Sequence, residues 1–240
     1  MLLRCVPGEL ISPSTDRSIS LSTVRVWDLP TRVFHWCLVI CFLGLVVTGE
    51  VAGDALIWHF RLGYTLLSLL LFRLAWGMVG GHWSRFSTFV AGPGVILRYL
   101  QGTASPEHSV GHNPVGALSV LGLLFFALLQ VVAGLFSDDE IASSGPLAKM
   151  VSGDWVSLAT TYHSKVGKVI LIALVVLHVS AIIFYRLRRG ENLVAPMLHG
   201  DKELPEVYQP SRDDTASRVL GALTFALCAA AVTWLVKWAG

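Results

Sequence analysis

The sequence is poor in charged residues. Asp, Glu, Lys and Arg make up only 14% of its 240 residues, against about 25% in an average soluble domain, while 54% are apolar. A mean hydropathy of +0.64 points the same way. This balance excludes an ordinary soluble domain, and a formal net charge of +2 is too small to indicate a nucleic-acid partner. We therefore predict an integral membrane protein surrounded by lipid.

Cysteine motifs that attach haem or bind zinc are also missing. The four cysteines, Cys5, Cys37, Cys41 and Cys228, form no C-x-x-C pair and no C-x-x-C-H sequence. Any haem must therefore be held without a covalent bond. Residues 1–23 contain neither a compact apolar run nor the cleavage site of a secretory signal, which predicts a cytoplasmic tail.

Long apolar runs are what the sequence does contain. Five of them are near the roughly 20 residues that a helix needs to cross a bilayer. Strand-like alternation is absent from these runs, and a backbone in lipid satisfies its own hydrogen bonds as a helix. The predicted fold class is therefore all-α, a helical membrane bundle. The runs cover residues 31–49, 57–80, 114–136, 162–185 and 216–236.

Basic residues predict the sidedness, because Lys and Arg near span ends are retained in the cytoplasm. They gather before the first run and in the second and fourth connections, whereas the first and third connections are acidic. The protein is thus expected to be multi-pass, with its N-terminus cytoplasmic and its C-terminus outside. The basic set is Arg4, Arg17, Arg25, Arg32, Arg85, Arg98, Arg186, Arg188, Arg189 and Lys202. The acidic set is Glu50, Asp54, Asp138, Asp139, Glu140 and Asp154, with Lys149 the basic exception.

Four histidines lie in or at the ends of the runs: His35, His59, His163 and His178. Ionisable groups are costly in a bilayer and indicate function. The predicted topology pairs His35 with His178 near the inner face, and His59 with His163 near the outer face. Fifteen residues separate His163 from His178, about 22 Å along a helix and about 60° around it, so one helix can serve two stacked haems. Paired imidazoles fill both axial positions of haem iron, which favours electron transfer.

Simpler interpretations apply to several of these residues. A single histidine at a span end, such as His35 or His59, is more often interfacial, whereas His178 has no ionisable neighbour within residues 170–184. The remaining histidines are predicted to be solvated or interfacial in loops: His82, His108, His112 and His199. Six tryptophans near span ends are assigned to the interfacial belt: Trp27, Trp36, Trp58, Trp76, Trp83 and Trp155.

Short motifs in a fixed order extend over residues 24–196. They are VRVWDLPTR at 24–32, FHW at 34–36, HFRLGY at 59–64, FRLAWG at 72–77, RFS at 85–87 and GHNPVG at 111–116, followed by His163 and His178. In this order they resemble the bacterial cytochrome b-561 family, which includes the cytochrome b subunits of membrane-bound nickel-iron hydrogenases. The resemblance implies a four-helix core with two b-type haems on the four histidines, located in a bacterial inner membrane and linking a quinone pool to a redox partner.

The resemblance also divides the chain into three parts. These are the tail 1–23, the four-helix dihaem domain 24–196, and a linker with a fifth transmembrane helix, 197–240. The tail and the fifth helix lie outside the shared pattern. Residues 86–100 are expected to form short helices on the inner surface, where a quinone pocket is one possibility. The outer loop 137–161 is a candidate docking face for a periplasmic cytochrome c or a hydrogenase subunit.

Haem propionates are anionic and favour basic partners. Arg73 lies fourteen residues beyond His59, about 21 Å along the helix, which brings it near the inner haem. Two interpretations stay open: Arg73 binds that haem, or it snorkels to the headgroups. Arg32 is a further candidate for the inner haem, and Lys165 or Lys168 for the outer one.

The predicted function is transmembrane electron transfer between quinone and a periplasmic redox partner, by a subunit of a respiratory oxidoreductase rather than a stand-alone enzyme. Two alternatives stay open. One is a non-redox transporter or scaffold whose histidines relay protons or bind another metal. The other is an oxidoreductase that couples quinone directly to a small oxidant such as superoxide.

Overall fold

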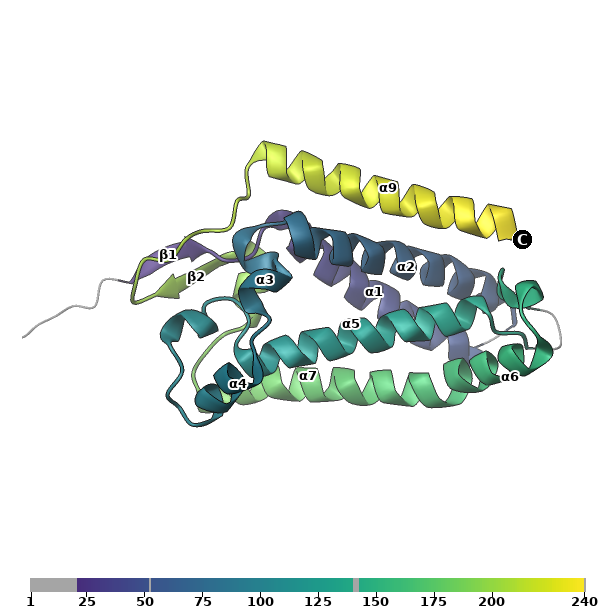
Figure 1. Ribbon diagram of the computed structural model, residues 1–240, viewed down its shortest axis with the longest axis horizontal. Helices are drawn as coiled ribbons and strands as arrows, with labels where there is room; N and C mark the ends of the chain where they lie inside the picture. Colours follow the sequence, from purple (N-terminus) through teal and green to yellow (C-terminus); the bar gives the residue numbers. More distant parts are fainter. Residues whose placement is uncertain (1–20, 52, 140–142, 240) are drawn as a thin grey trace, which may run out of the picture.

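The computed structural model of the protein describes residues 21–51, 53–139 and 143–239. Five long helices run side by side along its long axis (Figure 1): α1 (Leu29–Val51), α2 (Leu56–Val79), α5 (Pro114–Leu135), α7 (Lys168–Arg188) and α9 (Thr215–Ala239). All five are long and apolar enough to cross a membrane, which confirms the predicted spans. Most of the predicted tail, with Arg4, Cys5 and Arg17, lies outside the described residues, as does Glu140.

The fourth span is longer than predicted. Helix α6 (Gly153–Thr161) continues through η5, a π-helical segment (Tyr162–Gly167), directly into α7. Together they form one helical stretch of 36 residues. The predicted span begins at residue 162, because the mixed polar composition of 153–161 hides the first two turns of the helix. The end of the bundle that carries α6 is called the α6 end below.

Helix α2 is the central element of the bundle. Half of its apolar window, 50%, is buried, against 11% in each of the other four spans. It packs against α1, α5 and α9, and α7 packs against α5. The fifth helix therefore belongs to the same bundle and lies along α2 (Figure 1). The apolar core comprises Phe34, Cys41, Leu66, Leu67, Leu69, Leu70, Phe72, Trp76, Val131, Leu135 and Val232.

The other end of the bundle holds two short strands that the sequence analysis missed. Strand β1 (Ser22–Arg25) pairs antiparallel with β2 (Asp201–Leu204), and Ser22 lies opposite Leu204. Four residues are too few for a visible alternation, and the two partners lie far apart in the sequence. This end is called the strand end below.

Short helices complete the connections. The expected short helices within 86–100 are present as α3 (Phe86–Phe89) and α4 (Pro93–Leu100), and α8 (Val194–His199) precedes β2. Four 3-10 turns are η1 (Gly53–Ala55), η2 (His82–Ser84), η3 (Pro106–Ser109) and η4 (Ala148–Met150). Helix α5 begins with a capped turn, because the Asn113 side chain accepts the Gly116 N–H at 2.7 Å and Pro114 needs no donor there.

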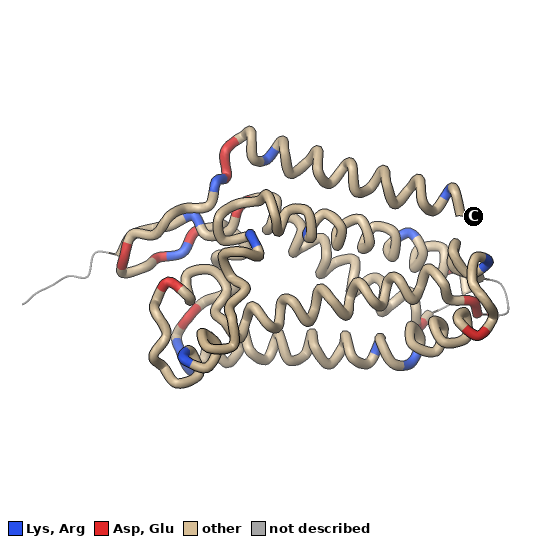
Figure 2. The backbone as a smooth tube through the Cα atoms, in the orientation of Figure 1, with Lys and Arg blue, Asp and Glu red and all other residues tan. Residues whose placement is uncertain are grey.

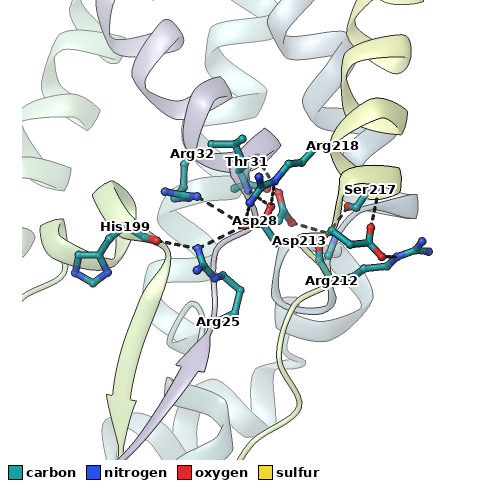
Figure 3. A network of polar contacts seen from close by, with 12 residues as sticks. Arg25, Asp28, Thr31, Arg32, His199, Arg212, Asp213, Ser217 and Arg218 are labelled. Carbon is teal, nitrogen blue, oxygen red and sulfur yellow. Dashed lines mark hydrogen bonds and ion pairs between the residues drawn. The ribbon is translucent and has the colours of Figure 1, made fainter.

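An ionic cluster ties α9 to the strand end (Figure 3). Asp213, whose side chain is only 6% exposed, forms ion pairs with Arg25 at 3.4 Å and Arg218 at 3.1 Å and accepts the Leu29 N–H at 3.0 Å. Arg32 lies 3.7 Å from the same carboxylate. Burial alone would raise the pKa of Asp213, but the bonds from Arg218 and Leu29 and the nearby charges hold it below its usual value. The cluster joins the first strand, the first helix and the last helix.

Asp28 is a second, fully buried hub at this end. Its carboxylate accepts the N–H of Thr31 at 2.8 Å, the indole N–H of Trp76 at 3.1 Å, the N–H of Gly81 at 3.1 Å and the Ser84 hydroxyl at 2.7 Å. Asp28 thereby caps α1 and joins it to the end of α2.

Three tryptophans do not belong to the interfacial belt. Trp76 is 0% exposed, and Trp27 and Trp83 are also buried, so the prediction was wrong for these three. Buried indoles need a hydrogen-bond acceptor, and those of Trp76 and Trp83 find one in Asp28 and in the Gln209 carbonyl. The other three, Trp36, Trp58 and Trp155, are exposed as a belt requires.

Candidate functional site

Two of the predicted site histidines meet at the α6 end. His59 on α2 and His163 on η5 have ring centres 6.0 Å apart, with the ring planes at 88°. Metal–imidazole bonds of about 2 Å would set two coordinating nitrogens roughly 4 Å apart across a metal. Adding about 1 Å from each nitrogen to its ring centre gives about 6 Å. The spacing of the two rings fits a metal held between them.

The second nitrogen of each ring has a main-chain partner. Nδ1 of His59 lies 3.1 Å from the Leu45 carbonyl oxygen, and Nδ1 of His163 lies 2.9 Å from that of Gln130. A carbonyl can only accept, so each Nδ1 carries the proton and donates it. Each Nε2 is then left with a lone pair. This is the arrangement of metal-ligating histidines, whose other N–H typically donates to a carbonyl or carboxylate.

Space for a planar group lies beside these rings. A cavity of about 400 Å³ is lined by both histidines and by mainly apolar side chains of α1, α2, α5 and α7. Gly49 and Gly134 let the backbone approach the rings: a Cβ would lie 3.2 Å from Cε1 of His59 at Gly49 and 2.8 Å from Cε1 of His163 at Gly134. Neither glycine is evident from the sequence alone. Lys168, a predicted partner of the outer haem, lines the cavity and pairs with Glu50 at 2.7 Å.

The other two site histidines lie toward the strand end. His35 on α1 and His178 on α7 are close enough to interact electrostatically. Nδ1 of His35 is buried and has no hydrogen-bond partner within the described part of the chain. A buried polar atom without a partner is costly, so this site fits a bound group that supplies one.

Arg73 is buried in the same region. Arg73 is only 3% exposed, so its side chain does not extend to the lipid headgroups. The snorkelling interpretation was therefore wrong. Its guanidinium carbon lies 4.8 Å from the centre of the Phe86 ring and 5.9 Å from that of Phe89. Nη1 has no hydrogen-bond partner among the residues that the structure describes. A buried cation with a free donor is suited to an anionic group such as a carboxylate.

His112, predicted to be a solvated or interfacial loop residue, is half-buried and lies beside this cluster. Its ring centre lies 4.6 Å from those of Trp27 and Phe89, and its buried Nδ1 has no partner among the described residues. Burial, followed by the charges of Arg73, His178 and His35, lowers the pKa of His112 to about 3, which keeps the ring neutral. The signal for this residue in the sequence was its place in the GHNPVG motif, immediately before the cap of α5.

Within the described ranges, no group of three or more His, Cys, Asp or Glu side chains could hold a metal ion. The arrangement defines a class: a helical membrane protein in which two histidines meet at one end of the bundle, and two more lie with a buried arginine toward the other end.

Comparisons with known proteins agree with this class. The family model of the prokaryotic cytochrome b561 matches residues 26–200. The probable Ni/Fe-hydrogenase B-type cytochrome subunit of Bradyrhizobium diazoefficiens is 25% identical over 223 residues, which cover 79% of this chain and 90% of the relative. The probable Ni/Fe-hydrogenase 1 B-type cytochrome subunit of Escherichia coli K12 is 24% identical over 218 residues, 77% of this chain and 93% of the relative. No solved structure gives a significant match.

The chain belongs to the prokaryotic cytochrome b561 family. It is a multi-pass bacterial membrane protein, a b-type cytochrome that transfers electrons and uses haem b.

Proposed function

We propose that the protein holds two haem b groups and carries electrons across the membrane between the quinone pool and a periplasmic redox partner. His59 and His163 are the axial ligands at the α6 end, and His35 and His178 those at the strand end. The observation that carries the proposal is the His59–His163 pair, with ring centres 6.0 Å apart and both Nδ1 atoms bonded to carbonyls. One helical stretch supplies a ligand to each site.

When bound, haem b accepts and releases one electron at a time at its iron. Two imidazoles would hold the haem iron at each site, which would leave no position on it for oxygen or another small substrate. The carbonyls of Leu45 and Gln130 hold two of the rings in one tautomer, so no proton has to move on those rings when the electron does. Arg73 offers a buried positive charge and a free donor to a propionate, which favours the reduced state of the strand-end site.

The strand end is the cytoplasmic end in this proposal. More Lys and Arg residues lie there than at the α6 end, among acidic residues (Figure 2), and the positive-inside rule, which counts the basic residues, favours the inner face. The N-terminus is then cytoplasmic, His35 and His178 hold the inner haem, and His59 and His163 hold the outer haem. The C-terminal end of α9 lies at the opposite, periplasmic face.

We place quinone beside the inner haem. A cavity of about 230 Å³ at the strand end has a mixed polar and apolar lining that suits a quinone head group, and α3 and the start of α4 form part of it. Its lining includes Trp83, Ser87, Phe89, Glu107, His108 and His112. His112 thus contributes to this cavity while its ring lies near the inner ligands.

The periplasmic partner is proposed to be a hydrogenase-type redox subunit, with a cytochrome c as the other candidate. The support is twofold: the relatives are named as hydrogenase cytochrome subunits, and the α6-end loop lies beside the outer pair. Asp154 and Trp155 lie in the first turn of α6, next to that loop, and are exposed.

Quinol should reduce the haem of the protein, and the rate of this reduction should depend on His112. In liposomes that contain the purified chain, a soluble quinol is expected to reduce the haem, followed by absorbance. His112→Phe keeps the aromatic packing and loses the imidazole, so quinol-driven reduction should slow by about tenfold, the effect of one lost polar contact. Dithionite should still reduce the variant fully, and exposed His199→Phe should match the wild type.

Failure of quinol to reduce the wild-type protein would contradict the quinone role. Membranes without any haem absorbance would instead favour a transporter or scaffold. Brisk quinone reduction by superoxide alone, with no partner protein, would favour the third function considered above.

A further inference from the structure

The ligand at the α6 end lies in an irregular part of its helix. His163 is the second residue of the π-helical segment η5. In a π-helix each N–H bonds five residues back instead of four, and such segments are frequent at functional sites. The change of register at its boundary with an α-helix disturbs the regular pairing, so a main-chain carbonyl there benefits from another donor.

Gln130 on α5 supplies that donor. Its side-chain Nε2 donates to the main-chain carbonyl of His163 at 2.7 Å. Its own main-chain carbonyl accepts the Nδ1–H of the same histidine at 2.9 Å. Gln130 therefore holds both the backbone and the ring of His163. Apart from Ser119, it is the only residue of α5 whose side chain carries hydrogen-bonding groups, and polar side chains at such depth usually have a function.

Two glycines make this double contact possible. A Cβ at Gly167 would collide with Oε1 of Gln130 and lie 2.6 Å from Cε1 of Tyr162. Gly134 lies one helical turn after Gln130 and gives room to the His163 ring, because a Cβ there would lie 2.8 Å from its Cε1. Side chains four residues apart share a helix face. One face of α5 and the last residue of η5 thus enclose the ligand.

The π-helical segment also changes how the two ligands of this helix are related. It acts as one residue inserted into an α-helix, so His178 lies about fourteen regular steps beyond His163. That places the two side chains about 40° apart, in the opposite sense to the 60° expected for a regular helix. The orientation of His163 therefore depends on whatever stabilises η5.

We propose that Gln130 is a positioning residue that fixes His163 through η5 and thereby sets the reduction potential of the outer haem. This inference rests on the proposed ligand role of His163. A firm Nδ1–H bond to a carbonyl makes an imidazole a stronger electron donor and favours oxidised iron. Without the side-chain anchor the His163 backbone is free to shift, the ring bond loosens, and the potential rises.

The test is a redox titration of the purified protein with Gln130→Met. Methionine keeps the length of the side chain and removes its donor. At a fixed solution potential, the ratio of oxidised to reduced outer haem should fall roughly tenfold. This corresponds to an increase of about 59 mV in its reduction potential. The inner haem should be unchanged. The electron paramagnetic resonance signal of the outer haem, which depends on the axial rings, should shift as well.

Three further variants make the outcome decisive. His163→Leu identifies the outer potential, because that potential alone should disappear. Gly167→Ala displaces the Gln130 side chain and should raise the same potential as Gln130→Met. Gln101 is exposed at the opposite end of the bundle, so Gln101→Met should change the potential of neither haem.

The variants distinguish failure of the His163 ligand role from failure of the Gln130 positioning role. If His163→Leu keeps both potentials, the proposed ligand role fails. If His163→Leu loses one potential but Gln130→Met and Gly167→Ala match the wild type, or shift both haems equally, the role of Gln130 is overturned and the ligand assignment stands.

Discussion

Replacing His178 by leucine should remove the inner haem and leave the outer one in place. Leucine fills similar space but offers no lone pair to iron, and His35 alone then holds only one axial position. The haem content should fall from two per chain to one, measured as pyridine haemochrome against protein. The retained haem should keep its potential, because its ligands are at the other end of the bundle.

His163→Leu is the reciprocal variant and should lose the other haem. The two single-haem proteins should have complementary spectra that together reproduce the wild type. His199→Leu is the matched control, because His199 is exposed at the strand end. The proposed pairing is wrong if His178→Leu keeps both haems with unaltered potentials.

Asp28→Ala should destabilise the fold more than any surface change. Four donors lose their acceptor in a fully buried site: the N–H groups of Thr31 and Gly81, the Trp76 indole and the Ser84 hydroxyl. Each buried donor left unpaired costs about 1–3 kcal/mol, so the loss of four such bonds should cost several kcal/mol. The unfolding midpoint in detergent should fall by about 10 °C.

Two variants calibrate this prediction. Asp28→Asn retains one carbonyl oxygen as an acceptor and should show a smaller decrease in the midpoint. Asp54→Ala changes an exposed aspartate in η1 and should leave it unchanged. A midpoint for Asp28→Ala equal to that of Asp54→Ala would show that the hub contributes no stability.

Hydropathy predicted the five spans because lipid imposes one simple rule on every residue of a crossing helix. The four histidines were evident for the same reason: an imidazole contrasts with its apolar neighbours. Arg73 was identified by its depth, but its burial depends on Phe86 and Phe89 in another segment, which periodicity does not reveal.

The features that the sequence did not reveal depend on contacts between distant residues. The β1–β2 pair joins segments about 180 residues apart. Trp76 resembles an interfacial tryptophan until Asp28 is seen to accept its N–H, and His112 resembles a loop residue until Trp27 and Phe89 enclose it. The η5 segment has no sequence signal of its own, and the contact to its His163 carbonyl comes from Gln130 in a different helix.

The most direct test of the account is the number of haems in the purified wild-type chain. Pyridine haemochrome quantification against amino-acid analysis, on protein expressed in haem-replete cells, should give two haem b groups per chain, both extractable because no cysteine motif binds them covalently. A value of one or none would contradict the assignment of His35 with His178 and His59 with His163 as two ligand pairs.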